Sequence, residues 1–106
     1  MVELTKENFD AEVKESALPV LVDFWGPKCG PCMALLPGVE EMAKEYDGRV
    51  KFCSVDVSGN RRVAIANKVM GIPAFLFWKD GAEIARVSGG DATLEKIREN
   101  VEALLK

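Results

Sequence analysis

The sequence predicts one α/β domain: a three-layer sandwich with a central mixed sheet of four to five strands and about four helices. Three observations predict it. Short apolar runs typical of buried strands alternate with segments of helical periodicity. An Asp-Gly pair at residues 80–81 separates two of these runs and predicts an antiparallel hairpin. At 106 residues the chain has the usual length of a single domain, so residues 1–106 are expected to fold as one unit.

The first half of the chain predicts a helix, a strand and a second helix. A short helix is expected over Thr5–Ser16, because Thr5 is a good capping residue. The run Val20–Trp25 consists of apolar strand formers except for Asp23, which predicts a strand covered on both faces. From Pro31 onward apolar residues recur at helical spacing until an Asp-Gly pair at 47–48 ends the second helix.

The second half predicts the remaining strands and helices. They are a strand at Val50–Val57, a short helix at Arg61–Asn67, strands at Ala74–Trp78 and Glu83–Ser88, a loop at Gly89-Gly90, and a final helix capped by Asp91 or Thr93. Asn67 is expected to supply the left-handed residue that ends the short helix. The first strand–helix–strand units predict right-handed crossovers and a parallel pair, to which the hairpin adds an antiparallel pair.

The composition excludes several classes of function. A net charge of −3 argues against a nucleic-acid surface, which would need clustered Lys and Arg. With no histidine, the chain has no Ser-His-Asp or Cys-His catalysis and no histidine-ligated zinc. Three cysteines do not make a secreted disulfide scaffold. Because Met1–Phe9 lacks the pattern of a signal peptide and no run of about 18 apolar residues exists, we expect a cytoplasmic protein without a membrane span.

The segment Cys29–Cys32, Cys-Gly-Pro-Cys, is the sharpest chemical feature. It lies where a predicted strand gives way to a helix, so free backbone N–H groups and the positive end of the helix dipole favour the Cys29 thiolate. A spacing of three residues places both sulfurs on one helix face, within disulfide reach. Pro31 suits a first helical turn because it has no N–H to lose. We therefore expect an exposed Cys29 to attack a substrate disulfide and a deeper Cys32 to resolve the mixed disulfide.

Two other roles are open to this cysteine pair. Half of a zinc site would need a second ligand pair, for which the chain offers only Cys53. A purely structural disulfide would close a very small loop in a compartment that keeps thiols reduced. Cys53 lies in an apolar strand and is expected to be an inert core thiol, with redox sensing as the alternative.

From Phe9 to the final helix, the chain resembles the thioredoxin family. The motifs that carry the resemblance are Val22-Asp23-Phe24-Trp25, Cys29-Gly30-Pro31-Cys32, Pro37 in the following helix, Gly71-Ile72-Pro73 before a strand, and Gly89 after the hairpin. The resemblance implies a thioredoxin fold and a protein dithiol–disulfide oxidoreductase that reduces disulfides in client proteins. It also implies a monomer recharged by a thioredoxin reductase, usually a flavin enzyme drawing on NADPH. No cofactor or metal is expected beyond the redox-active Cys29–Cys32 disulfide.

The resemblance also implies roles for individual residues. Asp23 resembles the family's buried acid, which handles the proton of Cys32; the alternative is a hydrogen-bonded structural acid. Pro73 resembles the family's cis-proline, so the backbone of Ile72 would pair with an extended client segment. A flat apolar contact patch around the cysteines would consist of Trp25, Gly30, Pro31, Ile72 and Gly89. For Trp25, a core aromatic is the alternative.

The sequence departs from the family's pattern beside the cysteines and the acid. Lys28 stands where Trp is usual, and we expect its charge to favour the Cys29 thiolate; a solvated lysine is the alternative. Met33 stands where Lys is common. Ser54 replaces a buried Lys that faces the acid in many members, so the pKa of Asp23 is expected to be raised further than in those relatives.

These departures, together with Ala74 in place of the usual Thr, leave two further interpretations open. One is a specialised thioredoxin-like protein that serves one dedicated partner or an atypical reductase. The other is a non-catalytic scaffold or binding module, against which the two intact cysteines argue, because a scaffold does not need both sulfurs.

Overall fold

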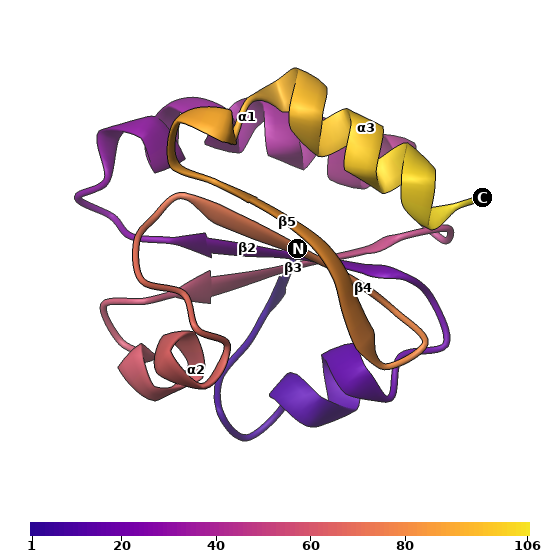
Figure 1. Cartoon of the computed structure of the whole chain (residues 1–106), viewed down its shortest axis with the longest axis horizontal. Helices are drawn as coiled ribbons and strands as arrows, with labels where there is room; N and C mark the ends of the chain where they lie inside the picture. The colour runs from indigo at the N-terminus through magenta and orange to yellow at the C-terminus, as the bar shows by residue number, and fades with distance from the viewer.

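A computed structural model describes residues 1–106, and its architecture is the predicted one. In chain order the elements are β1 (Val2–Glu3), η1 (Asp10–Lys14), β2 (Val20–Trp25), α1 (Gly30–Glu45), β3 (Lys51–Asp56), α2 (Arg61–Ala66), β4 (Ala74–Lys79), β5 (Ala82–Ser88), η2 (Gly89–Asp91) and α3 (Leu94–Leu104). One five-stranded sheet has the order β1-β3-β2-β4-β5. Figure 1 shows α1 and α3 on one side of this sheet and α2 with η1 on the other, which makes three layers.

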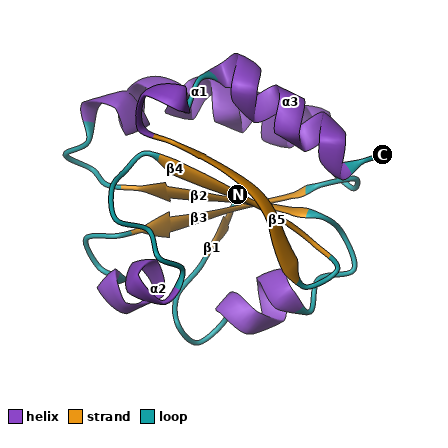
Figure 2. Ribbon diagram, viewed as in Figure 1, coloured by secondary structure: helices purple, strands orange, loops and turns teal.

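The sheet is mixed, because β4 runs antiparallel to β2 as well as to its hairpin partner β5. β2 and β3 are parallel, as predicted for the first strand–helix–strand unit. β4 pairs with β2 rather than β3 and runs antiparallel to it, so the second such unit contributes no parallel pair. The predicted hairpin joins β4 to β5 (Figure 2), and its Asp80 and Gly81 have the positive φ values of +52° and +80° that such a tight turn requires.

A hydrophobic cluster lies on each face of the sheet. On the α1 and α3 face, Leu21 and Phe75 pack with side chains from those two helices. On the other face, Val22 and Cys53 pack with side chains from η1 and α2. Because side chains alternate along a strand, Asp23 shares the face of Leu21 and therefore lies on the side that α1 covers.

Four local features differ from the sequence expectation. β1 was not predicted, because two residues are too few to show strand periodicity. The first helix is shorter than expected and is a π-helix, with the Glu15 N–H donating to the Asp10 carbonyl at 3.0 Å. The Gly89-Gly90 loop forms part of the 3₁₀ turn η2. Lys68, not Asn67, carries the left-handed φ after α2, at +57°.

Of the two residues predicted to cap the final helix, α3, the structure has Thr93 and not Asp91 as the N-cap. Thr93 is the capping residue, and its hydroxyl accepts a hydrogen bond from the Lys96 N–H at 3.2 Å. The helical periodicity predicts a buried stripe of Leu94, Ile97, Val101 and Leu104. The last three are buried, whereas Leu94 at the start of α3 is 40% exposed. None of the helices is both long and apolar enough to cross a membrane.

Candidate active site

The two cysteines of the Cys-Gly-Pro-Cys segment form a disulfide at the start of α1. Their Cα atoms are 5.2 Å apart. Cys29 is the N-cap of the helix, and its sulfur accepts a hydrogen bond from the Cys32 N–H at 3.2 Å. Gly30 is the first helical residue, and Pro31 occupies the first turn without losing a donor. The free N–H groups and the helix dipole therefore place partial positive charge at the Cys29 sulfur, which favours its thiolate after reduction.

The two sulfurs differ in their access to solvent. Cys29 is half-buried, whereas Cys32 is buried, with 5% of its surface exposed. A thiol must reach a client sulfur in order to attack it, so the geometry suits attack by Cys29 and resolution by Cys32.

Cys53 lies apart from this pair, on the opposite face of the sheet from α1. It has no exposed surface, and burial raises the pKa of its thiol to about 12. A thiol with such a pKa is protonated at neutral pH and unreactive, which agrees with the expected core thiol. No group of three or more His, Cys, Asp or Glu side chains is placed to hold a metal ion.

Asp23 is the buried acid of the site. It is 3% exposed, and its side chain makes no hydrogen bond or ion pair. Its neighbours across the sheet are Ser54 on β3 and Phe75 on β4, and neither supplies a positive charge. Burial therefore raises the pKa of Asp23 to about 7.

A second part of the site is the loop that ends at Pro73. The Ile72–Pro73 peptide bond is cis, as the resemblance implied. The backbone N–H and C=O of Ile72 make no hydrogen bond within the chain. The Gly89 N–H donates to the Pro73 carbonyl at 2.9 Å, so the residue that follows β5 lies beside the cis-proline.

The loop after β2 contacts this cis-proline loop. A Cβ built on Gly26 would lie only 3.1 Å from Cδ1 of Ile72, so the two loops touch at that glycine. Trp25, immediately before Gly26, is half-buried and belongs to neither hydrophobic cluster, which does not match a core aromatic. Lys28 is exposed and makes no ion pair.

Two exposed methionines beside these loops were not predicted as site residues. Met70 comes two residues before Ile72 and is 96% exposed, and Met33 follows the buried cysteine and is 42% exposed. Methionine is adaptable and packs against varied apolar surfaces. A signal was present in the sequence, because each methionine directly adjoins a motif.

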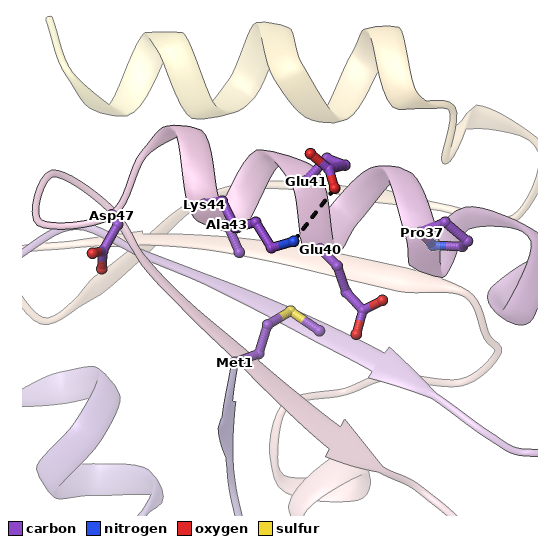
Figure 3. Close-up of a pocket in the computed structure, with 7 residues that line it drawn as sticks. All are labelled: Met1, Pro37, Glu40, Glu41, Ala43, Lys44 and Asp47. Atoms are coloured by element: carbon purple, nitrogen blue, oxygen red, sulfur yellow. Dashed lines mark ion pairs between the residues drawn. The ribbon is translucent and has the colours of Figure 1, made fainter.

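A large hollow of about 610 Å³ lies away from the cysteines, between α1 and the N-terminal residue (Figure 3). It is lined by Met1, Pro37, Glu40, Glu41, Ala43, Lys44 and Asp47. The Lys44 ammonium pairs with the Glu41 carboxylate at 3.5 Å, the dashed contact in Figure 3. None of the expected site residues lines this hollow, so it takes no part in the disulfide chemistry.

Comparisons with known proteins agree with this fold. The thioredoxin family model matches residues 1–103. A thioredoxin of Acetoanaerobium sticklandii is 43% identical over 106 residues, covering 100% of this chain and 97% of that protein. A thioredoxin of Peptoclostridium acidaminophilum is 42% identical over 105 residues, covering 99% and 92%. Thioredoxin C-2 of Corynebacterium nephridii is 44% identical over 89 residues, covering 84% and 82%. The chain therefore belongs to the thioredoxin family and is a protein dithiol–disulfide oxidoreductase.

Proposed function

We propose that this protein reduces disulfides in client proteins, with Cys29 as the attacking thiolate and Cys32 as the resolving thiol. The observation that carries the proposal is the unequal exposure of two bonded sulfurs at a helix N-terminus. The Cys29 thiolate attacks one client sulfur, the client disulfide breaks, and the released client thiolate takes a proton. Cys32 then attacks the Cys29 sulfur. The second client thiol leaves, and the two electrons gained by the client come from the Cys29 and Cys32 thiols, which are oxidised to the Cys29–Cys32 disulfide.

Asp23 is proposed to take the proton of Cys32 in the resolving step. Asp23 lies on the face of the sheet that α1 covers, and Cys32 is on α1. A base works best when its pKa is near the working pH, and a pKa of about 7 meets that condition. Without histidine, Asp23 is the one buried acid available for this transfer.

The client segment is proposed to bind along Ile72 in an extended conformation. The unpaired N–H and C=O of Ile72 can each bond to a client backbone group, as in the addition of a strand to a sheet edge. Trp25, Gly30, Pro31, Ile72 and Gly89 would surround the client cysteine as the apolar contact patch.

The partners follow from the same chemistry. The oxidised pair has to be reduced again, and we propose a thioredoxin reductase, a flavin enzyme drawing on NADPH or another donor. A reducing dithiol works where thiols are kept reduced, which favours the cytoplasm. We propose that residues 1–106 act as one monomeric domain with no bound cofactor and no nucleic-acid or membrane partner.

The activity is tested by insulin reduction with dithiothreitol as the electron donor. We expect the wild-type protein to accelerate insulin reduction and Cys29→Ser to run at the rate of dithiothreitol alone. A wild-type protein no faster than Cys29→Ser would show a scaffold instead of an enzyme.

Lys28→Ala is expected to raise the pKa of Cys29 in the reduced protein, because a neighbouring cation favours the thiolate. The pH dependence of thiolate absorbance or of alkylation at Cys29 measures this. Lys96→Ala, another exposed lysine without an ion pair, is the matched control on α3. The proposed role of Lys28 is wrong if Cys29 titrates in both variants as it does in the wild type.

A dedicated partner is the second candidate, and three departures from the family's pattern beside the cysteines and the cis-proline favour it: Lys28, Met33 and Ala74. Comparing reduction rates of insulin and of a set of unrelated disulfide proteins distinguishes a general reductase from one that serves a single client.

A further inference from the structure

Arg86 on β5 ties the edge strand of the sheet to the segment between α2 and β4. Its guanidinium donates hydrogen bonds to the backbone carbonyl oxygens of Asn67, at 2.9 Å, and Lys68, at 3.2 Å. The same guanidinium pairs with the Glu83 carboxylate of β5 through contacts of 2.5 Å and 2.8 Å. One side chain thus connects β5 to the beginning of the segment that leads to the cis-proline.

Only the first half of the connecting segment has backbone hydrogen bonds. The N–H groups of Asn67, Lys68 and Val69 donate to carbonyls of α2, whereas the backbone groups of residues 70–72 make none. A hollow of about 350 Å³ adjoins the segment and is lined from the other side by β5 residues that include Arg86. The side chains of Val69 and Ile72 pack against the adjacent hydrophobic cluster, but no strand ladder holds the backbone of residues 70–72.

The left-handed residue Lys68 ends α2. Its φ of +57° is unfavourable for a residue other than glycine, and the Lys68 N–H to Ile65 and Val69 N–H to Ala64 hydrogen bonds, each 2.9 Å, close the helix around it. The two carbonyls that Arg86 binds lie on either side of the Lys68 Cα, so the guanidinium adds a tertiary contact to this helix end.

Arginine is suited to this task where lysine is not. Its planar guanidinium carries five donors in a fixed arrangement and can bind a carboxylate and two carbonyls at once. Glu83 fixes the orientation of the guanidinium through two contacts, and a two-point pair of this kind is stronger than an ordinary exposed ion pair.

We propose that Arg86 is a positioning residue for client binding: it holds residues 67–72 so that Ile72 presents its free N–H and C=O to an extended client segment. This inference rests on the proposed function and deepens it. A segment that is ordered before the client arrives does not lose conformational freedom on binding, so the client binds more tightly. Removing the contact weakens binding of clients that carry a peptide backbone. It has little consequence for a small disulfide that has no backbone to pair.

The experiment compares Arg86→Ala with the wild type on two substrates, insulin and 2-hydroxyethyl disulfide. We expect the half-saturating insulin concentration to rise about five-fold, the effect of one ordering hydrogen bond, with the maximal rate nearly unchanged. The rate with 2-hydroxyethyl disulfide is expected to change much less. Arg86→Lys retains one charged donor, so its half-saturating insulin concentration is expected to fall between those of the wild type and Arg86→Ala. Cleavage by trypsin after the exposed Lys68 is expected to accelerate in Arg86→Ala, which reports on the segment itself.

Arg98→Ala is the matched control, because Arg98 also pairs with a glutamate and a second group but lies on α3. It is expected to leave the half-saturating insulin concentration unchanged. Unchanged insulin kinetics in Arg86→Ala, or an equal loss with both substrates, overturns the positioning role. A wild-type protein that reduces 2-hydroxyethyl disulfide but not insulin overturns the proposed function instead, so the two failures are told apart.

Discussion

Cys32→Ser is expected to abolish turnover and to trap a covalent complex between this protein and its client. Cys29 remains half-exposed at the helix N-terminus, so its thiolate still attacks a client disulfide. The mixed disulfide then has no internal thiol to resolve it, because the only other cysteine lies buried on the opposite face of the sheet. Insulin reduction should fall to the rate of dithiothreitol alone. Electrophoresis without reductant should show the complex, and dithiothreitol should release it.

Two variants make this result specific. Cys29→Ser should form no complex, because the buried Cys32 cannot reach a client sulfur. Cys53→Ser should turn over like the wild type, because burial keeps the Cys53 thiol protonated at neutral pH. A complex that forms equally well with Cys29→Ser, or that disappears in a Cys53→Ser and Cys32→Ser double variant, would contradict the assigned roles.

The sequence predicted the central strands well because their signal is local. The bounds of β2 are those predicted, since a strand covered on both faces reads as a continuous apolar run. The hairpin at Asp80 and Gly81 was equally clear, because few residues tolerate its positive φ values. The pairing of β4 with β2 was not predicted, because strand order depends on long-range packing that no local pattern records.

In the candidate site too, the features with a local sequence signal were predicted and those that depend on the tertiary fold were not. The cysteine pair and its helix cap followed from spacing and from helix chemistry. Asp23 stood out as one acid in an apolar run, and the structure places it where that pattern implied. The cis bond before Pro73 followed only from the family resemblance. The contacts of Arg86 were not predicted at all, because they join residues 18 and 19 positions apart through the tertiary fold.

Asp23→Asn is expected to stabilise the oxidised protein at pH 8 and to have little effect at pH 4. The folded pKa of about 7 lies above the ordinary value of 3.8, so between these values the folded chain binds more protons than the unfolded one. The free energy of unfolding therefore falls as the pH rises through this interval. Above pH 7 the buried charge costs up to about 4 kcal/mol, which the neutral amide avoids. Urea unfolding of both proteins at pH 4 and pH 8 measures the difference.

The matched control for stability is Asp47→Asn, an exposed acid beyond the end of α1 whose side chain makes no hydrogen bond. Its free energy of unfolding should differ from that of the wild type by the same small amount at both pH values. A gain from Asp23→Asn that is equal at pH 4 and pH 8 would contradict a buried acid that titrates near neutrality.

The same substitution is expected to slow the resolving step, and this separates a catalytic carboxylate from a merely destabilising one. An amide cannot accept the proton of Cys32, so release of the second client thiol should slow and lose its dependence on pH near 7. Attack by Cys29 uses the helix N-terminus and should keep its own pH dependence. Rapid mixing with a client disulfide resolves the two steps. Since Asp23→Asn gains stability at pH 8 while losing rate, loss of folding cannot account for the slower step.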